Sequence, residues 1–358
     1  MISGMTNGLR KQFLIGTLLS TFWIQHAGAW GEKGHHLICQ LASREVKESE
    51  LKKFFKTRGH TLGHLCNIPD IYWRSLPKEQ SFAGNPTHFF ESDVVNIELK
   101  DVPLSLKEFV AKVAAKNPGE SPRDLLTRTG TLWWRAEQFS QLATQAAQRA
   151  SKALAPKENI LEGEADAEPY SVAVYEMFVD MGLMGHFVGD VSMPYHNISD
   201  YDGYAQKHGG IHGYYETQCV GEYDDAELDT QVEAAVAKIP DYSKNESVVA
   251  VMKQLSVQAE KEVALVQKLD HILKPSVDKS DRHGLRKSVP AKRLPHEEGC
   301  AAFRPMIVKQ LARSVKALAF FWDQIYAQGS RPKLERYRSF RYPLSPDFVP
   351  PSYIDELK

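Results

Sequence analysis

The feature that most constrains the fold is a long apolar segment, residues 170–191, that carries a histidine and an aspartate. Pro169 opens this segment and Pro194 closes it, as is typical of helix boundaries. The segment is too apolar on all sides for a surface helix, so we expect it to be buried in the middle of the molecule. His186 and Asp190 lie four residues apart, which predicts that both side chains share one face of this helix.

Hydrophobic periodicity predicts further helices and very few strands. Helical spacing occurs in residues 34–47, 105–115, 132–154, 246–273 and 302–325. We therefore expect an all-α fold with one main domain over residues 30–329. Three segments break the helical pattern, and we interpret them as a polar loop over 157–168, a long excursion or flexible link over 274–299, and an irregular C-terminal tail over the surface in 330–358.

The N-terminal residues predict an exported protein. Arg10 and Lys11 precede a short apolar run over residues 13–24, and residues 27–29 have the small-x-small pattern that signal peptidase accepts. We expect a signal peptide over residues 1–29, cleavage that leaves Trp30 as the first residue, and a secreted or periplasmic product. An N-terminal membrane anchor is the less favoured alternative because the apolar run is short. No later segment is apolar enough to cross a membrane.

The charge balance argues against a broad basic surface for nucleic acid. The formal net charge is −1, and removal of the signal peptide takes away two positive charges and no negative ones. Any attraction for phosphate must therefore come from a local site, which bound divalent metal ions would provide. Four cysteines follow the predicted cleavage point, and export makes disulfides plausible, but the sequence leaves all three pairings of Cys39, Cys66, Cys219 and Cys300 open.

A second pair of metal-ligand type follows the first. His212 and Glu216 repeat the spacing of His186 and Asp190, and His196 lies between the two pairs. One pair alone would favour a structural hydrogen bond between a buried imidazole and a carboxylate. Two pairs together favour a metal site, because burial of these groups costs several kcal/mol unless they are paired or bind a cation. Imidazole with carboxylate is a common ligand set for zinc.

Further candidate ligands lie upstream of the apolar segment. Trp30, once it is the first residue, would offer its amino group and carbonyl as a chelate, and His35 follows it closely. Asp70 and His88 stand in loop-like surroundings and add a carboxylate and an imidazole. His36 should point away from His35 on the helix. His60 and His64 are weaker alternatives as ligands, and His208 is a rival to His212, although only His212 has a carboxylate four residues later.

Taken in order from Trp30 to Glu216, these motifs resemble the superfamily of S1/P1 nucleases and zinc-dependent phospholipases C. The resemblance implies a phospholipase C/P1 nuclease-like helical bundle with three Zn²⁺ ions in a cleft. It implies that Asp70 also orients or deprotonates the attacking water. The implied ligands are Asp70, His88, His186 and Asp190 for the first zinc ion, His196, His212 and Glu216 for the second, and Trp30, His35 and Asp190 for the third.

Departures from the nuclease pattern leave the substrate open. Glu216 stands where nucleases usually carry Asp and phospholipases carry Glu. Nucleases usually place Arg three residues after the first aspartate, whereas this chain has Trp73 there and Arg74 next. Phe89 matches an aromatic that stacks on a base in the nucleases, and Trp73 or Tyr72 could stack on a base or enclose a choline group.

The resulting hypothesis is a monomeric, zinc-dependent endonuclease. It would hydrolyse single-stranded DNA or RNA to 5′-nucleotides and could also act as a 3′-nucleotidase, with Phe89, Trp73 and Arg74 contacting the substrate. One alternative is a phospholipase C that acts on phosphatidylcholine-type lipids with the same metal ions. A second alternative is a zinc-stabilised helical binding protein without catalysis, which the carboxylate-rich ligand set disfavours.

Overall fold

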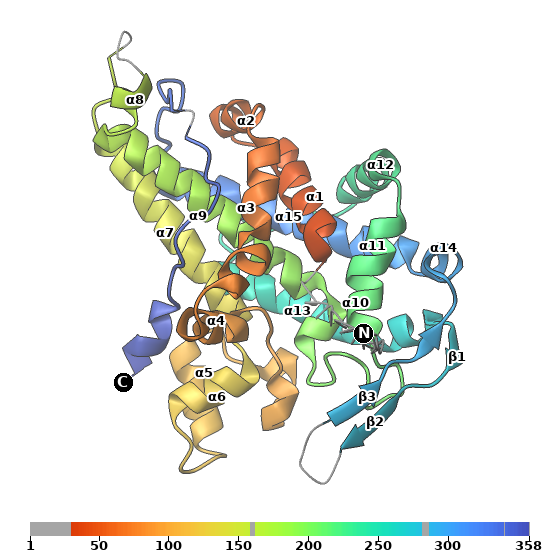
Figure 1. The fold of residues 1–358 in the computed structure, drawn as a ribbon. Coiled ribbons are helices and arrows are strands. Elements are labelled where there is room, and N and C mark those ends of the chain that lie inside the picture. The colour runs from red at the N-terminus through yellow and green to blue at the C-terminus, as the bar shows by residue number, and fades with distance from the viewer. Residues whose placement is uncertain (1–29, 158–161, 281–285, 340, 358) are drawn as a thin grey trace, which may run out of the picture.

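The apolar segment forms helix α9 (Pro169–Ser192), which lies at the centre of the helices in the computed structural model (Figure 1). The structure describes residues 30–157, 162–280, 286–339 and 341–357. Helices α1, α3, α7, α13 and α15 all pack against α9. Most of its side chains are buried, His186 and Asp190 among them. The helix can be apolar on all sides because neighbours surround it, as the sequence predicts.

Helices dominate the described residues, so the expected all-α class is confirmed at this level. The α-helices are α1 (Gly31–Glu45), α2 (Ser49–Phe55), α3 (Gly59–Ile71), α4 (Lys78–Gly84), α5 (Leu106–Ala114), α6 (Pro122–Thr129), α7 (Leu132–Lys152), α8 (Glu162–Ala165), α9, α10 (Ile211–Gly213), α11 (Cys219–Glu222), α12 (Asp225–Val236), α13 (Val248–Leu269), α14 (His296–Gly299) and α15 (Arg304–Gln328). The short 3-10 turns are η1 (Trp73–Ser75), η2 (Asn85–Thr87), η3 (Ser92–Val95), η4 (Leu99–Asp101), η5 (Pro194–Asn197), η7 (Cys300–Ala302) and η8 (Ser352–Leu357), and η6 (Tyr214–Gln218) is π-helical.

The predicted helices agree with these bounds to within a few residues, apart from the end of the segment 246–273. There α13 stops at Leu269, and the chain enters strand β1 (Ile272–Lys274). The polar loop expected over 157–168 contains the short helix α8, and part of it lies outside the described residues. The predicted signal peptide, residues 1–29, lies wholly outside them.

The charged segment 274–299 forms small antiparallel sheets and not only an irregular link. Strand β1 pairs with β4 (Lys292–Arg293), and β2 (Val277–Ser280) pairs with β3 (Arg286–Val289). Residues near the two ends of this hairpin-like segment form hydrogen bonds with the loop that precedes α10. The Ser276 and Ala291 amides donate to the carbonyls of Lys207 and Gly209, and the Ser276 hydroxyl accepts from the Gly209 amide.

Two disulfides resolve the pairing that the sequence leaves open. Cys39 of α1 bonds to Cys66 of α3, and Cys219 of α11 bonds to Cys300 of η7. The first bond joins two helices that both pack against α9 at Gly185. A Cβ atom at that glycine would lie 2.2 Å from the Cys39 sulfur, so only glycine allows this close approach. Both disulfides are compatible with an exported protein.

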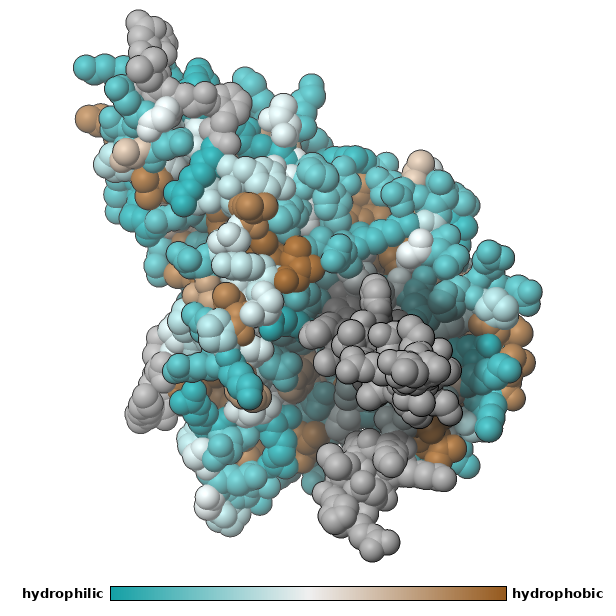
Figure 2. All heavy atoms as spheres, viewed as in Figure 1, coloured by the Kyte–Doolittle hydropathy of each residue, from teal (hydrophilic) through white to brown (hydrophobic). Residues whose placement is uncertain are grey.

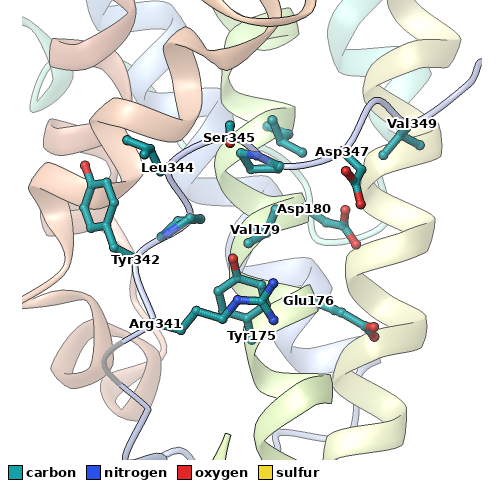
Figure 3. Close-up of a pocket in the computed structure, with 13 residues that line it drawn as sticks. Tyr175, Glu176, Val179, Asp180, Arg341, Tyr342, Leu344, Ser345, Asp347 and Val349 are labelled. Atoms are coloured by element: carbon teal, nitrogen blue, oxygen red, sulfur yellow. The ribbon is translucent and has the colours of Figure 1, made fainter. Parts of the chain in front are cut away.

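The C-terminal tail is irregular, as expected, but many hydrogen bonds tie it to the helices. The carbonyls of Pro346 and Val349 accept from the Trp73 indole at 3.0 Å and from the Arg135 guanidinium at 2.6 Å. Figure 3 shows residues 341–349 crossing α9, with Tyr342 and Leu344 toward the orange helices and Asp347 and Val349 toward the yellow one. The tail therefore braces α3, α7 and α9 against one another.

The surface carries mainly hydrophilic residues on the face drawn in Figure 2, and the hydrophobic ones are scattered in small groups. The large apolar side chains instead form one continuous core between the helices. Among the described residues, none of the helices has both the length and the apolar character that a bilayer crossing requires.

Candidate metal centre

His186 and Asp190 lie one helical turn apart on α9, and both side chains are buried. The Nδ1 atom of His186 lies 2.8 Å from the Cys66 carbonyl oxygen, to which it can donate a hydrogen. That bond leaves Nε2 with a lone pair, which points toward the Asp190 carboxylate at 3.3 Å. A backbone carbonyl that orients the far nitrogen in this way is a common outer partner of metal-binding histidines.

Asp70 and His88 join this pair from two other parts of the chain. Asp70 lies near the end of α3, and His88 directly follows η2. The His88 Nδ1 atom is 2.9 Å from the His186 Nε2 atom, 3.1 Å from an Asp190 oxygen and 3.6 Å from an Asp70 oxygen. Tetrahedral zinc with bonds of 2.0–2.1 Å places neighbouring donor atoms about 3.3 Å apart. The observed spacings lie around this value.

A second group consists of His196, His212 and Glu216. The Nε2 atoms of the two histidines face each other at 3.1 Å, and His212 Nε2 lies 3.0 Å from a Glu216 oxygen. The Nδ1 atom of His196 contacts the His88 carbonyl, and that of His212 lies 2.7 Å from the Tyr201 carbonyl. Because both Nδ1 atoms face carbonyl oxygens, both Nε2 atoms are oriented as acceptors and need a positive charge between them.

The pKa values of these three residues also indicate that the group needs a positive charge. Burial lowers the pKa of His196 to about 3. Burial also acts to lower the pKa of His212, but the neighbouring Glu216 carboxylate outweighs it and raises that pKa. Burial raises the pKa of Glu216 to about 7. The three groups therefore share a site for a single positive charge, which either a proton or a metal cation can supply.

A third group brings His35 to the other side of Asp190. The His35 Nε2 atom is 3.3 Å from an Asp190 oxygen, and its ring stacks on that of His186 with centroids 4.1 Å apart. Gly189 makes room for it, because a Cβ atom there would lie 2.7 Å from His35 Nδ1. Asp190 therefore faces both His35 and the pair formed by His88 and His186.

Trp30 lies beside these groups with its side chain fully buried. Its backbone nitrogen donates to a Glu216 oxygen at 3.0 Å, and its indole nitrogen donates to the Gly189 carbonyl at 2.8 Å. The backbone adopts a left-handed conformation with φ of 50°. The nitrogen that cleavage would free as an amino group therefore lies next to the second donor group.

The donor atoms fit divalent cations. The described residues contain three groups that could each hold a metal ion, made up of His35, His186 and Asp190, of Asp70, His88 and His186, and of His196, His212 and Glu216. The Asp190 oxygen that faces His35 and the Glu216 oxygen that faces His212 lie at ion-pair distance from those rings but form no well-directed hydrogen bond, and neither ring nitrogen of His35 forms one. Such unsatisfied buried atoms are costly unless a cation binds them.

A cavity of about 620 Å³ opens beside the donor groups. Its wall includes Trp30, Lys33, Asp70, Arg74 and Thr217. The Arg74 side chain is 25 % exposed, and its Nε atom lies 2.7 Å from the Asp70 carboxylate. The cavity thus presents a cationic group and a carboxylate within reach of the same bound molecule.

The structure buries Trp73, which was expected from the sequence to contact the substrate. Its side chain is only 4 % exposed, and its indole packs on Phe139 and Phe348 under the C-terminal tail. The short turn η1 rotates Trp73 away from Asp70 and directs Arg74 into the cavity instead. Tyr72 packs against the core as well, whereas Phe89, next to His88, is partly exposed.

The structure places His208 outside the donor groups. Its Nδ1 atom pairs with Asp270 at 2.8 Å, and Arg293 binds the same carboxylate. Tyr201 contacts the second donor group and was missed at the level of the sequence. Its ring is 54 % exposed and lies edge-on to His212 with centroids 5.5 Å apart. No local pattern marks Tyr201, because its position depends on the loop that leads to α10.

Comparison with models of protein families gives no match for this chain, and a comparison with curated proteins gives no match either. The assignment to a family is therefore a hypothesis based on the motifs and on the donor groups.

Proposed function

We propose that this chain is a secreted zinc-dependent phosphodiesterase that hydrolyses single-stranded nucleic acid to 5′-nucleotides. The observation that carries the proposal is the convergence of nitrogen and oxygen donors from distant segments on three adjoining positions that need positive charge. Carboxylates take part in every group, which is typical of catalytic zinc sites and not of closed cysteine sites. A 3′-nucleotidase activity would use the same groups.

The residues that would hold zinc are those of the three groups, with Asp190 shared between the group of His35 and the group of His88 and with the amino end of Trp30 added after cleavage. Zinc in such a site supplies Lewis acidity toward phosphate oxygens and makes a water molecule nucleophilic near neutral pH. The buried side chains exclude bulk water from these positions, because His35, His186 and Asp190 are fully buried.

Asp70 and Arg74 are the groups that would act on the substrate and the attacking water. Burial acts to raise the pKa of Asp70, but His186 and Arg74 outweigh it and lower that pKa, so the carboxylate is ionised at neutral pH. An ionised Asp70 at the cavity wall can orient the water and accept its proton. The Arg74 guanidinium, beside it, is placed to hold a phosphate oxygen.

Exposed aromatic rings favour a nucleic-acid substrate. Tyr201 presents an exposed ring beside His212, and Phe89 presents a partly exposed ring beside His88. Aromatic rings stack on unpaired bases, and each such contact contributes about 1–3 kcal/mol. Two rings that flank the donor groups would therefore select single strands, whose bases are free to stack.

A phospholipase C is the second candidate, because apolar side chains are also exposed near the cavity. Ile71 lines the cavity and is 44 % exposed, and Phe82 of α4 is 72 % exposed. These side chains could contact acyl chains at a lipid surface. A binding protein without catalysis would use the same donor groups for stability alone.

One assay panel separates these functions. The mature protein is incubated with a single-stranded DNA 20-mer, the RNA equivalent and phosphatidylcholine vesicles, each with and without EDTA. We expect cleavage of the nucleic acids that EDTA abolishes and added zinc restores. Hydrolysis of lipid alone would overturn the nuclease in favour of the phospholipase, and activity that resists EDTA would overturn the metal mechanism. Inactivity on all substrates with zinc bound would identify a binding protein.

A further inference from the structure

Three histidines that are not part of the metal centre come together where α1 packs against α3. His36 lies on α1, and His60 and His64 lie on α3. The same two helices carry His35 and Asp70 toward the cleft. His36 and His35 are adjacent in sequence, so their side chains leave α1 in different directions. We call His36, His60 and His64 the outer histidine cluster.

The contacts within the outer histidine cluster are close. The rings of His36 and His60 lie with centroids 4.7 Å apart. The His36 ring rests on the backbone of α3 at Gly63, where a Cβ atom would lie 2.5 Å from its Nδ1 atom. His60 and His64 are four residues apart, so they share the face of α3 on which this ring lies. His64 is also near enough to His36 to interact with it electrostatically.

A backbone carbonyl of the C-terminal tail orients the His64 ring. Backbone carbonyls orient the rings of His186 and His212 in the metal centre in the same way. The His64 Nε2 atom lies 2.9 Å from the Leu344 carbonyl oxygen, to which it can donate a hydrogen. This bond leaves a lone pair on Nδ1. Figure 3 shows Leu344 and Tyr342 on the side of the tail toward the orange helices, and the Tyr342 ring is 5.2 Å from that of His64.

We propose that the outer histidine cluster binds one divalent transition-metal ion of the zinc, copper or nickel type. Two imidazoles four residues apart on a helix are an established way to hold zinc, and a neighbouring helix here adds a third. A set of imidazoles selects these ions over calcium and magnesium, which prefer oxygen. The cluster's nitrogen atoms do not meet the 4.8 Å spacing of the cleft groups. Binding therefore requires a change of side-chain rotamer within the cluster, and His60, which is exposed, has room for one.

Such an ion would join α1 to α3 at a second point. The Cys39–Cys66 disulfide already joins these helices at another point. An ion that binds only the folded state raises the free energy of unfolding in proportion to the logarithm of its concentration over its dissociation constant.

The test is a difference in metal content between the wild-type mature chain and the double variant His60→Gln/His64→Gln. Both are dialysed to equilibrium against a series of zinc concentrations, and bound zinc is measured by plasma mass spectrometry. We expect the variant to bind one equivalent less while its cleft zinc is unchanged. A matched control, His271→Gln/His296→Gln, removes two other exposed histidines and should bind as the wild type does. Equal zinc content in the wild type and in His60→Gln/His64→Gln overturns the site.

The single variant His36→Gln tests the third ligand. We expect zinc affinity at the outer site to fall at least about tenfold while one equivalent still binds, because His60 and His64 remain. The same titration, followed by the zinc-dependent increase in melting temperature, should show a smaller increase for the variant. Unchanged affinity and an unchanged melting response would overturn the assignment of His36.

Discussion

At the scale of single residues, Asp190 connects the donor group of His35 to that of His88. One carboxylate oxygen faces His35, and the other faces His88 and His186. Its pKa lies well below the usual range, because the neighbouring histidines outweigh the effect of burial. A fully buried carboxylate that stays ionised needs cationic partners on both sides. Asp190 is therefore suited to bridge two metal ions.

Tyr201 offers a test of substrate recognition at the residue scale. We expect Tyr201→Ala to raise the KM for a single-stranded DNA 20-mer about tenfold and to leave kcat nearly unchanged, because stacking on one base contributes about 1–3 kcal/mol. Tyr201→Phe should behave like the wild type, since it keeps the ring. The backbone carbonyl that binds His212 is present in both variants. Steady-state kinetics with equal KM values for Ala and Phe would show that no base stacks there.

Asp180 offers a pH test away from the metal centre. It lines a cavity of about 360 Å³ beneath the tail (Figure 3), where burial and then the Glu176 carboxylate raise its pKa to about 7. The unfolded chain releases this proton near pH 4, whereas the folded chain keeps it up to about pH 7. The folded state therefore binds more protons in that window, so this group makes the free energy of unfolding decrease as pH rises from 4 to 7.

Asp180→Asn removes this pH dependence. We expect the variant to be more stable than the wild type by about 1–2 kcal/mol at pH 8, a value reduced for partial exposure, and to match it at pH 4. Urea unfolding at both pH values measures the difference. A gain in stability that is the same at pH 4 and pH 8 would contradict a raised pKa at Asp180.

At the scale of secondary-structure elements, the helices tolerate the least change where they approach each other most closely. At Gly185, α9 meets the disulfide that joins α1 and α3, and a Cβ atom would lie 2.2 Å and 2.6 Å from the two sulfur atoms. We expect Gly185→Ala to lower the free energy of unfolding by about 2–3 kcal/mol because the sulfur atoms or the helix must move. Gly163→Ala, at an exposed glycine of α8 with nothing nearby, should change it very little.

The measurement is urea unfolding of both glycine variants under oxidising conditions. Because Gly185 is adjacent to His186, metal content should be recorded for the same samples. Equal stability of Gly185→Ala and Gly163→Ala would show that α9 has more freedom than the close approach suggests.

At the scale of the whole molecule, the proposed metal centre would gain a ligand from the predicted processing of the chain. The Trp30 nitrogen is placed beside Glu216, but a peptide nitrogen is a poor metal ligand and a free amino group is a good one. We expect a mature chain with one extra residue before Trp30 to bind less zinc and to lose most of its hydrolytic activity. Full zinc content and full rate in the extended chain would rule out Trp30 as a ligand.

The control for this prediction is the chain that begins at Trp30, made by cleavage of a fusion protein in vitro. Circular dichroism of the two chains should be equal, since Trp30 lies at the start of α1 and one added residue leaves the core unchanged. A difference in zinc content would then be due to the terminal nitrogen and not to folding.

The sequence by itself determined the local features of this protein. The apolar composition of α9 predicts a buried helix, and the spacing of His186 with Asp190 and of His212 with Glu216 places each pair on one turn. These predictions succeed because helical periodicity is a short-range property. The presence of histidines and carboxylates in such positions was enough to predict a metal site.

Only the tertiary structure decided which distant residues meet. His88 reaches α9 because the chain folds back across it, and the pairing of Cys39 with Cys66 follows from the packing of α1 on α3. Trp73 seemed suited to the cleft from its place near Asp70, yet η1 turns it under a tail whose contacts no local pattern reveals. Contacts between distant segments depend on how helices and loops pack, and loop geometry is not encoded in a residue period.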